Sequence, residues 1–146
     1  MVIAVDFDGT IVEHRYPSIG REIPFAFATL KMLQRDGHRL ILWTVREGAL
    51  LDEAVEFCRE RGVEFFAVNS NYPDEDEDRT VRRSRKLKAD LFIDDCQVGG
   101  LPDWGVIYEL VSQKISYAEY LHRQGLAPDP NPQPRSLWSK IFGKKK

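Results

Sequence analysis

One stretch at the amino terminus decides how the chain is interpreted: Val2-Ile3-Ala4-Val5-Asp6-Phe7-Asp8-Gly9-Thr10. Its first residues form a short apolar, β-branched run, which is typical of a buried strand. Asp-Gly is a strong turn signal, so we expect the strand to end at the aspartates. Asp6 and Asp8 stand two positions apart, which places both side chains on one side of an extended chain. The stretch therefore predicts a strand that delivers two carboxylates to one place.

The chain that follows alternates between helical and extended patterns. We expect further strands at residues 40–43, 65–68 and 91–93, and helices at about 23–36, 47–61, 103–112 and 116–125. The expected strands are short and apolar on every side, as parallel strands covered by helices usually are. Alternating strands and helices are the order of an α/β sheet. The sequence therefore predicts a three-layer α/β/α, Rossmann-like fold around a central, mainly parallel sheet.

Length and composition predict one compact domain with a carboxy-terminal extension. The chain has 146 residues, of which 42% are hydrophobic and 30% are charged. A chain of this size can build a core without disulfides or metal. Prolines alternate with polar residues from residue 128 to 134, a pattern that stiffens a linker and excludes helix. We expect a domain over residues 1–126, a linker over 127–134, and a basic tail, amphipathic or disordered, over 135–146.

The charge is unevenly distributed along the chain. The formal net charge is −2, yet residues 135–146 are basic and contain no acid, so the body is acidic. An acidic body argues against sequence-independent binding of nucleic acid, which needs clustered Lys and Arg. In the tail, a short helix would place four apolar side chains on one side: Leu137, Trp138, Ile141 and Phe142. The tail is therefore a candidate for weak contact with a membrane or a protein, with a flexible solubilising end as the alternative.

The cysteines and the apolar runs indicate a cellular compartment. Cys58 and Cys96 show no CxxC spacing, and we interpret them as reduced thiols, although the two could still pair. No apolar run reaches the length of a membrane-spanning helix, and the amino terminus lacks the features of a secretory signal. We therefore expect a cytoplasmic protein.

Polar residues follow three of the expected strands. Asp6 and Asp8 end the first strand, Thr44 ends the second, and Asp94-Asp95 ends the last. Ligands of open parallel sheets bind at the carboxyl ends of the strands, so we expect these side chains to meet. Carboxylates held close together favour a cation, and hard oxygen ligands favour Mg²⁺ over zinc.

In combination, these motifs resemble a known family. Asp6-Phe7-Asp8-Gly9-Thr10, Leu42-Trp43-Thr44, Lys86 and Ile93-Asp94-Asp95 resemble, in this order, the four-part signature of the haloacid dehalogenase superfamily of phosphotransferases. The resemblance covers residues 1–126 and implies a Mg²⁺-dependent phosphomonoester hydrolase. The segments 11–22 and 69–85 are short, which predicts a member without a large cap domain. Its site would be open to solvent unless a neighbouring subunit of a homo-oligomer covers it.

The resemblance implies a role for each matching residue. Asp6 would be the nucleophile that forms an aspartyl-phosphate, and Asp8 would be the general acid and base. Thr44 would bind a phosphoryl oxygen. Lys86 would neutralise charge on the nucleophile and the phosphate, with Lys88 as the alternative.

The resemblance also implies ligands for the metal and the substrate. Mg²⁺ would be held by carboxylates of Asp6 and Asp95 and by the backbone carbonyl of Asp8. Asp94 would either ligate the ion or orient a ligand. The substrate-binding loop would include Gly9 and Thr10.

Some assignments have alternatives. Arg46 and Asn69 follow the second and third expected strands and are candidates for substrate contacts, with ordinary loop polarity as the alternative. We expect the acidic run 74–78 to be a surface loop. The alternative function for the chain is a module that binds a phosphorylated ligand or a protein without turnover and is recruited through its basic tail.

Overall fold

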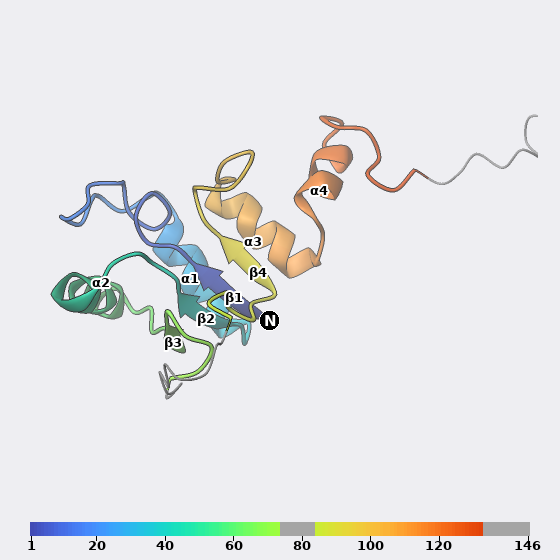
Figure 1. The fold of residues 1–146 in the computed structure, drawn as a ribbon. Coiled ribbons are helices and arrows are strands. Elements are labelled where there is room, and N and C mark those ends of the chain that lie inside the picture. Colours follow the sequence, from blue (N-terminus) through green and yellow to red (C-terminus); the bar gives the residue numbers. More distant parts are fainter. Residues whose placement is uncertain (74–83, 133–146) are drawn as a thin grey trace, which may run out of the picture. The chain divides into compact units, whose positions relative to one another are not determined.

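The computed structural model describes residues 1–73 and 84–132. Within these ranges, the chain forms four strands and four helices (Figure 1). Their order is β1 (Val2–Val5), α1 (Ala26–Arg35), β2 (Arg39–Leu42), α2 (Gly48–Glu60), β3 (Ala67–Val68), β4 (Leu91–Ile93), α3 (Trp104–Gln113) and α4 (Tyr117–Arg123). The acidic run 74–78 and the tail 135–146 lie outside the described residues.

The four strands form one all-parallel sheet in the order β3-β2-β1-β4. The last residues of the strands are in register, since Val5 pairs with both Leu42 and Ile93, and Leu42 pairs with Val68. The carboxyl ends are therefore flush. This sheet with its flanking helices confirms the α/β class and is consistent with the three-layer Rossmann-like architecture.

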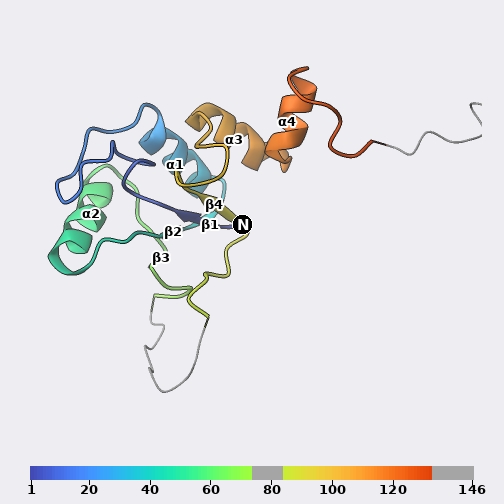
Figure 2. The same ribbon diagram turned by 45° about the horizontal axis from the view of Figure 1, so that its top comes forward.

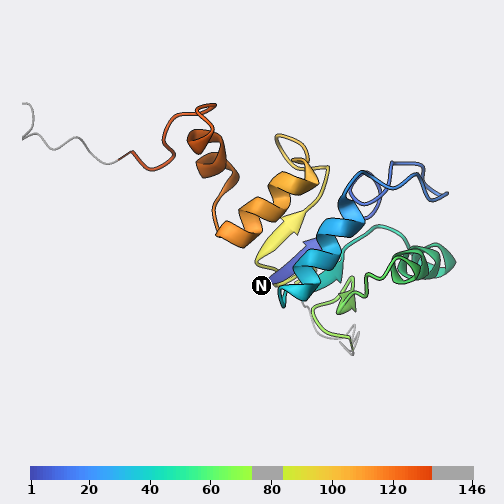
Figure 3. The same cartoon turned by 180° about the vertical axis from the view of Figure 1, so that it is seen from behind.

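The two faces of the sheet are covered differently. α1 lies behind β1 and β2 in Figure 1 and in front of them in the opposite view of Figure 3, and the tilted view of Figure 2 separates it from the strands. Side chains alternate along a strand, so the buried Ile3 and Val5 point to the face opposite Ala4. On the face of Ala4, the buried Leu87 packs in a cluster with Ile41 and Ala67.

The chain divides into two compact units, Met1–Tyr108 and Glu109–Lys146. The first contains the sheet, α1, α2 and the first turns of α3. The second contains α4, where the side chain of Ser116 accepts a hydrogen bond from the backbone N–H of Glu119 and caps the helix. The expected domain boundary at residue 126 stays a prediction.

Several elements begin or end away from their expected positions. α1 begins at Ala26 instead of residue 23, because Phe25 has a left-handed backbone with φ of 67°. The third strand was expected over residues 65–68, whereas β3 is only Ala67–Val68. Its neighbour Phe66 still donates a backbone hydrogen bond to the carbonyl of Leu40 at 2.8 Å, so the segment is aligned with β2 before the strand begins.

The two cysteines do not pair, and the described helices are short. Cys58 is buried, Cys96 is exposed, and both are free thiols, as expected. Of the helices in the described ranges, none combines the length and the apolarity needed to cross a membrane. No large cap is inserted in the described segment between β1 and α1, which is a loop.

Candidate functional site

The flush strand ends bring together the polar residues that follow them. The ladder continues past β1, because the backbone N–H of Asp6 donates to the carbonyl of Ile93 at 2.9 Å. It also continues past β3, because the backbone N–H of Asn69 donates to the carbonyl of Leu42 at 2.8 Å. Positions 6, 69 and 94 therefore lie at one edge of the sheet, as the sequence predicted.

Thr10 joins the loop after β1 to the loop after β4. Its hydroxyl donates to Oδ2 of Asp6 at 3.0 Å and accepts from the backbone N–H of Asp95 at 3.0 Å. Its carbonyl accepts from the indole Nε1 of Trp104 at 3.1 Å, and both side chains are buried. The position of Thr10 is thus fixed by the core, and Thr10 in turn orients Asp6.

Asp6 lies in an environment that disfavours its charge. Its pKa is raised from 3.8 to about 6, mainly by burial and to a smaller extent by the negative charges of Asp94 and Asp95. Hydrogen bonds from the backbone N–H of Phe7 and from Thr10 act in the opposite direction without offsetting the burial. A cation beside these three carboxylates would favour the ionised form of Asp6.

At this edge, the carboxylate oxygen Oδ1 of Asp95 is buried and has no hydrogen-bond partner within residues 1–73 and 84–132. Its carboxylate lies directly against Gly9, where an added Cβ would clash with it and where φ is +93°. The ligand atoms of Asp94, Asp95 and Cys96 all lie within 4.8 Å of one another. The carboxylate oxygens among them are the hard donors that Mg²⁺ prefers.

Asp8 lies in a different environment, paired with Arg46. The guanidinium donates from Nε to Asp8 Oδ2 and from Nη2 to Asp8 Oδ1, both at 2.7 Å. The side chains are buried, with relative exposures of 0% for Arg46 and 5% for Asp8. The pair raises the pKa of Arg46, chiefly through the hydrogen bonds to Asp8. The carboxylate of Asp8 therefore has a built-in counter-ion.

Thr44 and Asn69 connect the ends of β2 and β3. The side-chain amide of Asn69 accepts from the backbone N–H of Thr44 at 2.8 Å and donates to the Thr44 carbonyl at 2.9 Å. The Thr44 hydroxyl accepts from the backbone N–H of Arg46 at 3.2 Å, which leaves its own hydrogen available for a ligand. The side chain of Asn69 therefore holds the backbone of Thr44 in position through two hydrogen bonds.

The two candidate lysines flank Leu87. While Leu87 is buried against the sheet, Lys86 and Lys88 are exposed. The backbone N–H of Lys88 donates to the side chain of Asn71 at 2.6 Å. In the part of the chain that the structure describes, neither ammonium group forms an ion pair with a carboxylate. The catalytic role of Lys86, or of Lys88, stays a prediction.

Two contributions were missed in the sequence: the support of Thr10 by Trp104 and the pairing of Arg46 with Asp8. The second had a signal, because Arg46 stands two positions after Thr44 and so returns to the same side of an extended chain. The exposed Val45 between them fits this alternation, with 82% of its surface accessible. A cluster of buried carboxylates also requires a nearby cation.

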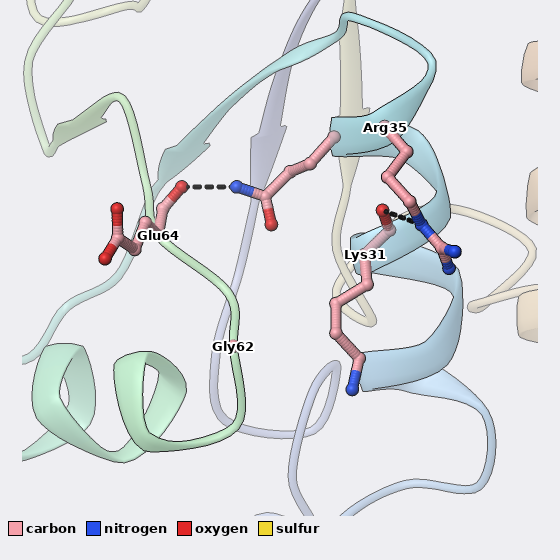
Figure 4. Close-up of a pocket in the computed structure, with 5 residues that line it drawn as sticks. Lys31, Arg35, Gly62 and Glu64 are labelled. Carbon is pink, nitrogen blue, oxygen red and sulfur yellow. Dashed lines mark hydrogen bonds between the residues drawn. The ribbon is translucent and has the colours of Figure 1, made fainter.

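A hollow elsewhere on the surface belongs to a different region. It is lined by Lys31 and Arg35 of α1, and by Gly62 and Glu64 (Figure 4). The side-chain amide of Gln34 crosses it to donate to the carbonyl of Glu64 at 2.6 Å. These residues lie at the end of α1 and before β3, near the amino ends of the strands, so the hollow is separate from the acidic edge.

Comparison with known proteins identifies a relative. A solved structure, that of a conserved protein from Bacteroides thetaiotaomicron, is 66% identical in sequence and matches with a TM-score of 0.76. The match covers 82% of this chain and 96% of that chain. No family model matches the sequence, and no curated protein matches it. From the identity and the coverage, the chain belongs to the same family as this conserved protein of Bacteroides thetaiotaomicron.

Proposed function

We propose that the chain is a Mg²⁺-dependent phosphomonoester hydrolase of the haloacid dehalogenase type, which acts through an aspartyl-phosphate on Asp6. The observation that carries this proposal is Oδ1 of Asp95, which is buried near Asp6 and has no hydrogen-bond partner among the described residues. A buried polar atom without a partner costs free energy, and a buried carboxylate oxygen costs more. A divalent cation bound at this edge would remove that cost.

The donor set fits magnesium. Carboxylate oxygens of Asp6 and Asp95 and the backbone carbonyl of Asp8 would hold the ion, while Asp94 orients the loop by accepting from the backbone N–H of Cys96 at 2.8 Å. When bound, the ion supplies positive charge that stabilises the phosphoryl oxygens during transfer. The hydroxyl of Thr10 keeps one oxygen of Asp6 oriented.

The reaction needs two carboxylates with separate roles. For the first step Asp8 has to carry a proton, on an oxygen that no longer accepts from Arg46. A carboxylate oxygen of Asp6 attacks phosphorus, the bond to the leaving oxygen breaks, and protonated Asp8 donates its proton to that oxygen. Water then attacks the phosphoryl group, Asp8 accepts its proton, and the bond between Asp6 and phosphorus breaks to release inorganic phosphate. The Thr44 hydroxyl donates to a phosphoryl oxygen, and Lys86 supplies a further positive charge.

The direct test is hydrolysis of p-nitrophenyl phosphate with and without Mg²⁺. We expect turnover that requires the ion, is lost in Asp6→Asn, and is unchanged in the matched control Asp52→Asn, an exposed aspartate on α2. Equal inactivity of wild type and Asp6→Asn, repeated with nucleotides and sugar phosphates, contradicts the proposal. That result would favour the module that binds phosphorylated ligands without turnover.

A further inference from the structure

The buried guanidinium of Arg46 binds both Asp8 and a loop that contains Pro17 and Ser18. Besides its two bonds to Asp8, Arg46 donates from Nη1 to the carbonyl of Pro17 at 2.9 Å and from Nη2 to the carbonyl of Ser18 at 3.0 Å. These contacts use four of the five N–H groups that a guanidinium carries. The guanidinium carbon also lies over two aromatic rings, 5.1 Å from the centroid of Phe7 and 5.4 Å from that of Tyr16.

The loop held by Arg46 spans residues 13–21, and we refer to it as the flap. Its base is closed by a hydrogen bond from the backbone N–H of Glu13 to the carbonyl of Arg21 at 2.7 Å. The ion pair of the same two residues, at 2.8 Å, reinforces the closure. Among the described contacts, those from Arg46 to residues 16–18 hold the exposed tip of the flap to the body of the domain.

We propose that Arg46 is a positioning residue that latches the flap onto Asp8, so that the orientation of Asp8 and the closure of the flap depend on one side chain. The catalytic part of this inference rests on the proposed function. The structural part, the latching of the flap, depends only on the hydrogen bonds described above.

The contacts argue against a direct role of Arg46 in binding substrate. Its side chain has no accessible surface, and a phosphate could reach it only by displacing Asp8 or the flap carbonyls. Displacing Asp8 would leave a carboxylate buried without its counter-ion, which is strongly unfavourable. Arg46 therefore acts on the reaction through Asp8.

A lysine cannot replace the guanidinium at this position. Arginine presents a rigid, planar set of donors, and this arrangement serves a bidentate carboxylate and two carbonyls at once. Lysine would keep the positive charge while losing the planar fork and its contacts with the rings of Phe7 and Tyr16. Arg46→Lys therefore separates the geometry of the latch from its charge.

The structural part is tested by limited trypsin digestion of the full-length chain, with cleavage at the Arg15–Tyr16 bond followed by mass spectrometry. Loss of the two hydrogen bonds to the flap should raise cleavage there on the order of tenfold in Arg46→Lys. Arg59→Lys, an exposed arginine of α2, should leave the rate unchanged. Cleavage at Arg39, inside β2, reports global unfolding and should not rise.

The double variant Asp8→Asn/Arg46→Met guards against misfolding, because it removes the latch without leaving a buried charge unpaired. It should open the flap as Arg46→Lys does. Unchanged cleavage at Arg15 in both folded variants would overturn the latch, whatever the activity of the wild type.

The catalytic part is tested with p-nitrophenyl phosphate and Mg²⁺. A misplaced Asp8 should lower kcat of Arg46→Lys by about 10²-fold, because small displacements of a reacting group have effects of that size, while KM stays within about twofold. A raised KM at unchanged kcat would instead assign Arg46 to substrate binding and overturn the positioning role. An inactive wild type with an opened flap in the variants would overturn the proposed function and leave the latch intact.

Discussion

Asp6 and Asp8 belong to one loop and are two residues apart, yet the two sides of this loop have opposite electrostatics. On the Asp6 side, Asp94 and Asp95 add negative charge, and one oxygen of Asp95 is buried without a hydrogen-bond partner in the part of the chain that the structure describes. On the Asp8 side, the buried Arg46 neutralises the carboxylate through two short hydrogen bonds. The chain thus contains the cation for one aspartate, while we propose that the other side receives a cation from solution.

The largest difference between the two aspartates is expected in the turnover of their asparagine variants. Asp6→Asn should abolish turnover, a loss of at least about 10⁴-fold, because no phosphoenzyme can form. Asp8→Asn should lose about 10²- to 10⁴-fold, the contribution of a general acid and base. Intact-mass spectrometry after addition of p-nitrophenyl phosphate should detect a phosphoryl adduct on Asp8→Asn and none on Asp6→Asn. Adducts of equal size on both variants would contradict the assignment.

The next effect concerns stability, where the two sides should respond differently. Arg46→Met leaves Asp8 buried and unpaired and should lower the free energy of unfolding by about 3–5 kcal/mol. Asp95→Asn removes charge from a cluster of like charges and, without Mg²⁺, should remain within about 1 kcal/mol of wild type. Urea unfolding monitored by circular dichroism measures both. Equal losses would mean that the two sides are not electrostatically distinct.

A smaller effect is expected in the pH dependence of stability. The fold raises the pKa of Asp6 from 3.8 to about 6, mainly by burial. In this interval the folded state binds the proton that the unfolded state has released, so this aspartate should lower stability as pH rises from about 4 to 6.

Urea unfolding at several pH values in EDTA would measure this contribution. The slope between pH 4 and 6 should change in Asp6→Asn and stay as in wild type in Asp52→Asn. Saturating Mg²⁺ should also reduce the destabilisation, because the ion favours ionised Asp6. An identical slope in Asp6→Asn and wild type would count against the raised pKa.

The smallest effect is a chemical signal of metal binding. Asp95 and Asp94 raise the pKa of the exposed Cys96 thiol, so removing part of their charge should speed its alkylation. Iodoacetamide labelling at pH 8 should accelerate about two- to fivefold on addition of Mg²⁺. Burial raises the pKa of Cys58 to about 12, so this cysteine serves as an unreactive internal control. An unchanged rate for Cys96 would contradict an ion bound at these carboxylates.

The row of strand ends could be predicted from the sequence because it depends on local signals. Apolar runs identify strands, Asp-Gly identifies the turn, and parallel pairing places the following residues at one edge. In the structure, Val5 pairs with both Leu42 and Ile93. This pairing places Asp6, Thr44, Asn69 and Asp94 at one edge of the sheet.

The features that could not be predicted depend on contacts between residues far apart in the chain or on unusual backbone conformations. The pair of Asp8 and Arg46 spans 38 residues and forms only because both side chains are buried at the same edge. The start of α1 depends on the left-handed backbone of Phe25, which is unusual for an aromatic residue. For Lys86, a basic run offers no local signal to choose between neighbouring lysines, and the structure joins neither to Asp6.

The indole of Trp104 gives this site an intrinsic optical reporter. Its N–H bonds to the carbonyl of Thr10, whose hydroxyl contacts Asp6 and the backbone of Asp95. A change of charge at the acidic edge therefore reaches the chromophore through one residue. Its emission in a Trp43→Phe/Trp138→Phe background, in which Trp104 is the one remaining tryptophan, would follow events at the aspartates in real time, without a label and without a substrate.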